Sequence, residues 1–408
     1  MTPRRVAVTG LGAISAIGNT AVEFWQSLRQ GRCGIGPIEA VDRTQLKYQQ
    51  GAEVRGFDPH AHFQKKHANL LDRFAQFALV AAREAVADAG IEWTTKLRAN
   101  TGVITGSCLG GQNSMDDGFA DVYIQRYKTP HPLTILRVMA HGGASHTSIE
   151  FGLTGPSFAV STGCASATHA IGQGYWMVRN WQVEAAIVGG SEATFSLFHL
   201  KSWEALRALA TDTCRPFSKN RSGLILGEGA AMLVLEPLEA ARARGAKIYA
   251  ELSGFGMSSD ARHVIKPSPE GAAQAIHSAL LDAELRPEQV GYVNAHGTGA
   301  PNADASETLA IHAAFGRHAE KLAVSSTKSM HGHALGATGA LEAVATILAL
   351  RHGVLPPTAN FTEADPQCDL DVIPNVAREA DVEYALSNSF AFGGLNAVLA
   401  FRRWTGGR

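Results

Sequence analysis

Three side chains of this 408-residue chain have the types and neighbours that covalent catalysis needs. They lie in the segments STGCASATHAIG, VNAHGTG and TKSMHGHALGATGA, which contribute Cys164, His296 and His333. A thiol serves as a nucleophile, and imidazoles beside it exchange the protons and hydrogen bonds that such a reaction requires. The three segments together predict nucleophilic catalysis through a covalent cysteine intermediate.

The sequence around Cys164 predicts a short buried strand at 158–161, a tight turn of small residues, and a helix that begins just after the cysteine. The unpaired N–H groups at the N-terminus of a helix favour negative charge. We therefore expect this helix to favour the thiolate of Cys164 over the thiol. A structural alternative stays open, because free cysteine is among the most buried residue types.

The two histidines each follow a predicted strand. His296 ends a strand-like run that begins at 293, and His333 precedes a helix-forming stretch at 334–350, with Lys328 five residues upstream. The alternatives are a hydrogen-bonded core histidine at 296 and a metal pair formed by His331 and His333. Zinc takes three or four protein ligands, and the chain has no CxxC or HExxH set to complete such a site. We therefore expect no metal.

The order of these motifs resembles that of the elongating β-ketoacyl-acyl-carrier-protein synthases, the Cys-His-His branch of the thiolase-fold condensing enzymes. The likeness runs from about Val6 to Phe401 and includes the cysteine turn, HGT, TKS followed by GHxxGATG, and the closing NSFAFGGLN. It implies an α/β protein with the thiolase-like five-layer αβαβα fold, built from two pseudo-duplicated halves.

The resemblance also implies a reaction. Cys164 would accept an acyl group from an acyl carrier protein, and the backbone N–H groups of Cys164 and Phe392 would hold the oxyanion, each such donor being worth about a hundredfold or more in rate. A malonyl thioester would then lose carbon dioxide, and His296 and His333 would stabilise the enolate. The product would be a 3-oxoacyl thioester two carbons longer. No cofactor is implied.

Further site residues follow from the same resemblance. Lys328 would be a buried lysine near the second histidine, Glu307 its polar partner, and Phe392 a gate beside the thiol. The implied substrate-binding residues are Leu109 at the constriction of the acyl pocket, Thr298, Glu307 and Gly393. Ordinary core packing is the alternative for Leu109 and Phe392.

Composition and charge argue against several other classes of protein. A formal net charge of −1 argues against nucleic-acid binding as a main function. No apolar run reaches the roughly 18 to 20 residues that span a bilayer. The five cysteines show no paired spacing, and the N-terminal MTPRRVAVTGLG is predicted to be a first strand and not a signal peptide. We therefore expect a cytoplasmic protein without membrane insertion.

Strand-like and helix-like segments alternate along the chain, which is typical of α/β proteins, and a helix is predicted at 69–90. A faint duplication is visible, because AREAVADAGI resembles IHSALLDAEL and AVSTG resembles AVSST. Two copies of one βαβ unit would place the turns carrying Cys164 and Lys328 at equivalent positions. We expect one half at 1–250, with the cysteine, and the other at 251–408, with both histidines.

The chain departs from the common family pattern in two motifs. Where HGTST is common it has Gly299 and Ala300, which removes a hydroxyl expected to bind the pantetheine arm. Where FGFGGTN is common it has Ala391 and Leu395, and Ala391 should stiffen the gate because alanine has less backbone freedom than glycine. These changes predict a pathway-specific synthase with a dedicated carrier, in fatty acid or in specialised polyketide or polyene synthesis.

The expected partners are an acyl carrier protein and a second subunit. Carrier proteins are acidic, so a basic rim should bind them, and the candidates are Lys65, Lys66, Arg126, Lys128 and Arg207. Condensing enzymes of this fold are dimers, with cross-subunit pocket walls expected at 131–152. The second subunit would be an identical chain or, alternatively, a chain-length-factor homologue.

Two other enzyme classes share the implied fold. A coenzyme A-dependent thiolase would use a second cysteine as base, and Cys368 in PQCDLD lies outside the glycine-flanked closing motif where that cysteine belongs. The starter-condensing branch has asparagine where this chain has His333. Both alternatives are therefore disfavoured.

Overall fold

The computed structural model describes residues 2–406 and contains one mixed sheet of ten strands, in the order β10-β9-β13-β14-β8-β1-β7-β6-β4-β5. The strands are β1 (Val6–Ser15), β4 (Thr101–Gly106), β5 (Ser157–Val160), β6 (Ala185–Glu192), β7 (Gly229–Pro237), β8 (Ala250–Ser259), β9 (Val290–Asn294), β10 (Ala323–Ser325), β13 (Tyr384–Ala391) and β14 (Leu395–Arg403). Two small two-stranded sheets pair β2 (Gly36–Pro37) with β3 (Gln50–Gly51) and β11 (Val354–Leu355) with β12 (Arg378–Glu379).

The large sheet repeats one pattern twice. In the first half β5, β4 and β6 are parallel, and β7 and β1 follow as antiparallel strands. In the second half β10, β9 and β13 are parallel, and β14 and β8 follow as antiparallel strands. A short antiparallel pairing of β1 with β8 joins the two sets. Cys164 follows β5 and Lys328 follows its counterpart β10, so the equivalence predicted from the sequence repeat is confirmed.

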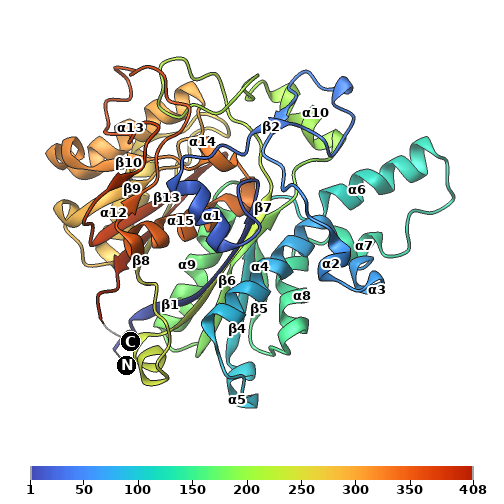
Figure 1. Ribbon diagram of the computed structural model, residues 1–408, viewed down its shortest axis with the longest axis horizontal. Coiled ribbons are helices and arrows are strands. Elements are labelled where there is room, and N and C mark those ends of the chain that lie inside the picture. Colours follow the sequence, from blue (N-terminus) through green and yellow to red (C-terminus); the bar gives the residue numbers. More distant parts are fainter. Residues whose placement is uncertain (1, 407–408) are drawn as a thin grey trace.

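Helices form three layers around these strands (Figure 1). The central helices α9 (Ser166–Arg179) and α15 (Thr338–His352) contact each other and strands of both halves. On the outside, α4 (Arg73–Ala89) and α8 (Gly142–Phe151) cover the first half, while α12 (Pro269–Asp282) covers the second with α13 (Pro301–Phe315) packed beside it. The result is the five-layer αβαβα arrangement implied by the resemblance.

The central helix α15 is buried along nearly its whole length, because 13 of its 15 residues are buried. Its sequence is apolar on nearly all sides, which is what a helix packed between the two halves of the large sheet requires. Small residues allow α15 to lie close to α9, and a Cβ atom at Gly339 would lie 1.9 Å from the hydroxyl oxygen of Thr168. The close packing of the two central helices therefore depends on glycine at this position.

The predicted helix at 69–90 is α4, which begins at Arg73. Its start is later than predicted because Asp72 is the N-cap and its carboxylate accepts the N–H of Phe74. Gly90 ends the helix with φ 59°, a left-handed conformation that glycine adopts without strain.

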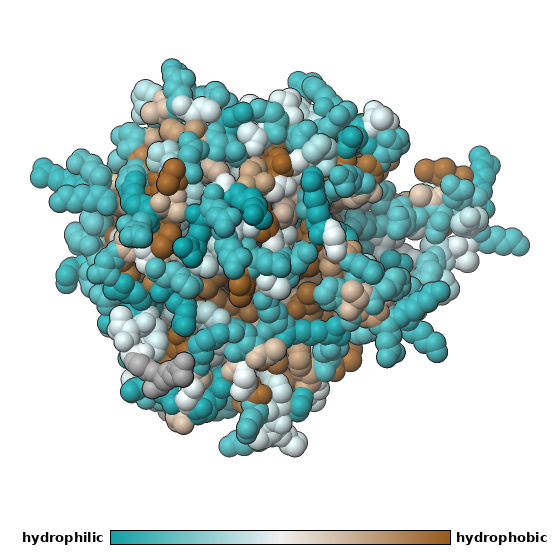
Figure 2. Space-filling view, viewed as in Figure 1, coloured by the Kyte–Doolittle hydropathy of each residue, from teal (hydrophilic) through white to brown (hydrophobic). Residues whose placement is uncertain are grey.

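A segment between β4 and α8 projects from the body of the molecule (Figure 1). It contains α6 (Gln112–Phe119), a π-helical turn at Ala120–Ile124 and α7 (Thr134–Val138). The projecting segment exposes several large apolar side chains: Phe119, Tyr123, Ile124, Tyr127, Ile135 and Leu136. In Figure 2 this segment has some brown, hydrophobic atoms among mostly teal ones. An apolar surface of this size is typical of a protein–protein interface.

The remaining helices are short. They are α1 (Ala21–Arg29), α2 (Pro59–His62), α3 (Lys65–Ala68), α5 (Thr95–Ala99), α10 (Leu197–Leu206), α11 (Leu238–Ala243) and α14 (Lys328–His331), with 3-10 turns at Arg43–Gln45, Pro287–Gln289, Gly316–Lys321 and Leu335–Ala337. Among residues 2–406, no helix has both the length and the apolar character needed to cross a lipid bilayer.

Candidate active site

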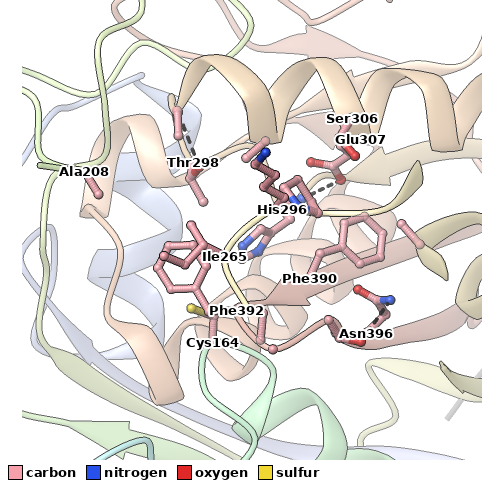
Figure 3. A pocket seen from close by; sticks show the side chains of 18 of the residues that line it. Cys164, Ala208, Ile265, His296, Thr298, Ser306, Glu307, Phe390, Phe392 and Asn396 are labelled. Carbon is pink, nitrogen blue, oxygen red and sulfur yellow. Dashed lines mark hydrogen bonds between the residues drawn. The ribbon is translucent and has the colours of Figure 1, made fainter. Parts of the chain in front are cut away.

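Segments from both halves of the sheet meet at one pocket with about 770 Å³ of empty space. Cys164 comes from the turn after β5, His296 from the turn after β9, His333 from the turn after α14, and Phe392 from the turn after β13. Figure 3 shows Phe392 next to the sulfur of Cys164, with His296 close by. The structure therefore brings the three predicted catalytic side chains together.

The geometry of the three side chains is compact. The Cys164 sulfur and one ring nitrogen of each histidine all lie within 4.8 Å of one another. The two imidazole rings are 5.4 Å apart between centroids and nearly perpendicular, at 84°. Cys164, His296 and His333 are 8%, 6% and 1% exposed. An acyl carbonyl bound to the sulfur would therefore lie within reach of both imidazoles.

Burial controls the ionisation of Cys164. Desolvation raises the pKa of the thiol to about 11, although Lys328 and the backbone N–H groups of Phe392 and Cys164 lower it. The cysteine lies just before α9, as predicted, and nearby backbone N–H groups do lower the pKa of its thiol, but burial raises that pKa by more, so the expected net preference for the thiolate is not found. The loss of hydration in the buried pocket outweighs the favourable dipole and N–H groups.

Both histidines of the pocket are held neutral. Burial lowers the pKa of His296 and of His333 well below the usual value, and the ammonium of Lys328 lowers both further. The Nδ1 atom of His333 lies 2.9 Å from the Thr338 hydroxyl oxygen. If that hydroxyl donates, the ring carries its proton on Nε2, where it faces the pocket as a hydrogen-bond donor.

Lys328 is fully buried and pairs with Glu342 of α15, which is also fully buried. The expectation that Glu307 is the partner of Lys328 is therefore wrong. Glu307 is engaged elsewhere, whereas Glu342 reaches the ammonium across the short turn between α14 and α15. Burial raises the pKa of Glu342, and the ammonium of Lys328 opposes that shift and favours the carboxylate. An acidic residue inside an otherwise apolar helix was the sequence signal for this pair.

Glu307 supports the turn that carries His296. Its two carboxylate oxygens accept the backbone N–H groups of His296 at 2.8 Å and Gly297 at 2.7 Å, and the side-chain amide of Asn388 donates to it at 3.1 Å. These three donors satisfy a carboxylate whose pKa burial raises. Glu307 also lines the pocket, so it is placed both to position His296 and to face a ligand.

Phe392, Gly393 and Thr298 line the pocket as well. Phe392 is 42% exposed, and the two glycines after it have φ values of 85° and 70°, in the left-handed region. The N–H of Gly393 donates to the carbonyl oxygen of Val264 at 2.7 Å, which ties this turn to a second loop. That loop, at 263–268, forms much of the pocket wall, and the sequence analysis did not identify it.

Leu109 does not line this pocket, contrary to expectation. It is 37% exposed on the loop after β4. Its backbone N–H and that of Cys108 donate to the buried carboxylate of Glu192, which also accepts from Gly336. Burial raises the pKa of Glu192 to about 7. The hydrogen bonds to Glu192 position the loop, and Leu109 is not among the residues that line the Cys164 pocket.

The five predicted carrier-binding residues do not form one patch around the pocket. Arg207 ends α10 in a left-handed conformation, with φ 57°, and precedes the pocket-lining Ala208. Lys65 and Lys66 lie in α3, and Arg126 and Lys128 lie in the projecting segment (Figure 1). Only Arg207 is next to a residue that lines the pocket.

The predicted metal alternative can be compared with this geometry. His331 bonds to the Thr327 hydroxyl and packs near Phe24, so it does not face the pocket together with His333. Within residues 2–406, Cys164, His296 and His333 are the one group whose ligand atoms are close enough to share a metal ion. The ammonium of Lys328 acts on both histidines and disfavours a cation among them.

Two family models match the chain. The model described as beta-ketoacyl synthase, N-terminal domain, matches residues 3–241, and the model described as beta-ketoacyl synthase, C-terminal domain, matches residues 249–362. Together they cover most of the chain, including all three pocket side chains.

Individual relatives match over nearly their whole length. Nodulation protein E of Rhizobium leguminosarum bv. trifolii is 44% identical over 400 residues, which are 98% of this chain and 99% of that protein. 3-oxoacyl-[acyl-carrier-protein] synthase 2 of Synechocystis sp. is 42% identical over 409 residues, with 98% of both chains covered.

The solved structure described as the ishigamide ketosynthase/chain length factor has a TM-score of 0.94 and 36% identity. The match covers 99% of this chain and 100% of that one. The expected fold and enzyme class, an acyltransferase of the 3-oxoacyl synthase type, are thereby confirmed. The chain belongs to the β-ketoacyl synthase family.

Proposed function

We propose that this protein catalyses a decarboxylative Claisen condensation of an acyl thioester with a malonyl thioester, through an acyl group carried on Cys164. The observation that supports this most directly is the arrangement of one sulfur and two imidazole nitrogens within 4.8 Å in a buried pocket. Such an arrangement provides a nucleophile and two neutral hydrogen-bond donors on the same side of one small site.

In the first half-reaction, the Cys164 sulfur attacks the carbonyl carbon of the acyl thioester. The sulfur–carbon bond forms as the carbon–sulfur bond to the carrier breaks, and the thiol proton passes to the departing carrier thiolate. The backbone N–H groups of Cys164 and Phe392, which are directed at the sulfur, are placed to bind the oxyanion of the tetrahedral intermediate. Because burial raises the pKa of the thiol, most of Cys164 is protonated in the free enzyme near pH 7.

In the second half-reaction, a malonyl thioester takes the place of the departed carrier. Its carbon–carbon bond to the carboxylate breaks, carbon dioxide leaves, and the electron pair forms an enolate. Neutral His296 and His333 donate hydrogen bonds to the enolate oxygen without a competing proton transfer, because their low pKa values keep them from holding an extra proton. The enolate carbon attacks the carbonyl carbon of the acyl group, and the bond from that carbon to the Cys164 sulfur breaks. A 3-oxoacyl thioester two carbons longer leaves, and the Cys164 thiolate takes up a proton from solvent.

The buried pair of Lys328 and Glu342 supports this chemistry electrostatically. The ammonium lies close enough to lower the pKa of both histidines and of the thiol, so it acts on all three side chains at once. Its counterion Glu342 limits that field. We assign Lys328 as an electrostatic residue and Glu342 as the residue that positions it.

The proposed carrier of both substrates is an acyl carrier protein, as the name of the Synechocystis relative indicates for that protein. Arg207 is the favoured basic contact because it adjoins the pocket, and Lys65, Lys66, Arg126 and Lys128 are kept as more distant candidates. Thr298, Gly393 and Glu307 would contact the pantetheine arm or the malonyl group, since all three line the pocket. We also propose a cytoplasmic location.

We propose that the two halves of the chain divide near residue 250, where β8 begins. We further propose that the chain functions as a dimer, through the apolar projecting segment and the helices that follow it. An identical second chain is the simpler assembly. A chain-length-factor homologue is the alternative, favoured by the likeness to a ketosynthase/chain length factor structure. Leu109 would then belong to the part of the pocket that the second subunit completes.

We propose that the enzyme serves one dedicated pathway of fatty acid, polyketide or polyene synthesis. The chain is about equally similar to a nodulation protein and to a 3-oxoacyl synthase, so the comparisons leave these pathways open. A coenzyme A-dependent thiolase is disfavoured because Cys368 is not among the residues that line the pocket.

The intact mass of the protein after incubation with a panel of acyl-carrier thioesters tests the proposal. A mass gain equal to the acyl group is expected for the wild type and not for Cys164→Ala. Addition of malonyl carrier to the loaded enzyme should remove the adduct and yield a 3-oxoacyl carrier. An adduct that persists in Cys164→Ala, or a loaded enzyme that malonyl carrier never discharges, would contradict the proposal.

A further inference from the structure

Two residues of α10 lie behind the Phe392 gate and have no role in the chemistry described above: Trp203 contacts Phe392, and His199 contacts Trp203. The indole N–H of Trp203 donates to Nε2 of His199 at 3.0 Å, one helical turn earlier. The Trp203 ring stacks on Phe392, with 6.1 Å between centroids and 26° between planes. Trp203 also lines the pocket that contains Cys164. A chain of three aromatic side chains thus leads from a buried histidine to the mouth of the site.

We propose that Trp203 is a specificity-determining residue of the acyl transfer, which holds Phe392 beside Cys164, and that His199 positions the Trp203 ring by accepting its N–H. The inference rests on the proposed function, because it concerns access of the acyl donor to Cys164. Acyl donors that need Phe392 to move must break the stacking with Trp203. The stacking energy therefore adds to the barrier for large donors and not for small ones.

The hydrogen bond determines which form His199 must have. The indole nitrogen is a donor only, so Nε2 of His199 must be unprotonated and its proton must lie on Nδ1. His199 is 7% exposed, and burial lowers its pKa to about 4, so the ring is neutral over the working range of pH. The backbone N–H of His199 donates to the Ser196 hydroxyl at the N-cap of α10, which anchors its turn of the helix.

The backbone around the gate makes such a restraint effective. Phe392 is followed by two glycines with positive φ, so its own turn imposes little restriction on its position. The backbone of the turn is held by the N–H of Gly393, which donates to Val264, and by the N–H of Gly394, which donates to Ala391, whereas the Phe392 ring itself stacks on Trp203. Offset stacking contributes about 0.5–1.5 kcal/mol beyond the buried area, which corresponds to an about two- to twelvefold change in the population of the open gate.

Alkylation of Cys164 by an iodoacetamide with a long N-alkyl chain, followed by peptide mass spectrometry, tests gate opening without any carrier or condensation. Iodoacetamide itself is the small probe, and its rate should stay unchanged in every variant. The variants are Trp203→Ala, Trp203→Phe, His199→Leu and His199→Gln, with Ser202→Ala as the matched control on the exposed side of the same helix. We expect Trp203→Ala to be alkylated at Cys164 by the long-chain reagent about two- to twelvefold faster than the wild type. Ser202→Ala should match the wild type.

The remaining variants test the hydrogen bond. Trp203→Phe keeps a stacking ring but has no N–H, and His199→Leu removes the acceptor, so the two should increase the alkylation rate equally. Their combination should be no faster than either alone, because both remove the same interaction. His199→Gln keeps an acceptor and should stay near the wild type. The rate at which acyl-carrier thioesters load Cys164 should change among these variants as the alkylation rate does when the acyl chain is long, and should stay unchanged for acetyl.

An unchanged rate of alkylation by the long-chain reagent in Trp203→Ala would overturn the proposal, as would additive effects of Trp203→Phe and His199→Leu. If Trp203→Ala does not fold, the double-variant comparison decides alone, since its substitutions are conservative in volume. A wild type that is alkylated at Cys164 but never acylated by any thioester would instead contradict the proposed function, and the gate result would stand independently.

Discussion

The buried pair of Lys328 and Glu342 allows a quantitative test of how the pocket is built. Both side chains are 0% exposed, so neither charge has water to replace a lost partner. Substituting Glu342→Leu leaves the ammonium without its counterion, which typically costs about 3–5 kcal/mol of stability. The chain of 408 residues has an unfolding entropy of about 0.9 kcal/mol per degree, at roughly 2.1 cal/mol/K per residue. The expected decrease in Tm is therefore about 3 to 6 °C.

Differential scanning calorimetry at pH 7 measures this change, with Glu363→Gln as the control. Glu363 pairs with Lys219 on the surface, where both are more than half exposed, and loss of such a pair should change Tm by less than about 1 °C. Adding Lys328→Met to Glu342→Leu removes the unpaired charge and should restore most of the lost stability. If the double variant melts as low as Glu342→Leu, the loss comes from packing, and the electrostatic account of the pair is wrong.

Three further results are expected. Because burial raises the pKa of Cys164 to about 11, the rate of alkylation of this thiol should increase about tenfold per pH unit up to pH 9, without a plateau. A plateau near pH 7 would instead indicate a thiolate–imidazolium pair. Glu307→Gln, which replaces one acceptor of the His296 turn with a donor, should slow condensation more than it slows alkylation of the thiol, measured side by side. Gly339→Ala should lower the free energy of unfolding by about 1–3 kcal/mol or more in urea titrations, since the new Cβ overlaps the Thr168 hydroxyl. Unchanged stability would mean that α9 and α15 can separate freely.

Much of the site was predictable because its residues lie in local motifs. A cysteine in a small-residue turn before a helix, and histidines at strand ends beside glycines, are patterns that neighbouring residues determine. The repeat of one βαβ unit likewise predicted that Cys164 and Lys328 follow equivalent strands, because copies of one sequence pattern form the same local structure.

Other features depended on side chains far apart in the chain. The partner of Lys328 proved to be Glu342 and not Glu307, since which carboxylate reaches the ammonium depends on how α15 packs. Leu109 is not among the residues that line the Cys164 pocket, and Glu192, from another strand, accepts the backbone N–H groups that fix its loop. The stacking of Trp203 on Phe392 joins two segments with no shared motif.

The sequence by itself predicted Cys164 as the proposed nucleophile, the two histidines that the structure places beside it, the type of fold and the internal repeat, since each follows from residue types at short spacing. Only the tertiary structure decided the ionisation of these groups. The helix before which Cys164 lies favours a thiolate, but the pocket formed by both halves of the sheet removes water from the sulfur and raises its pKa. Solvation depends on all the atoms around a group, and no local segment of the chain contains that information.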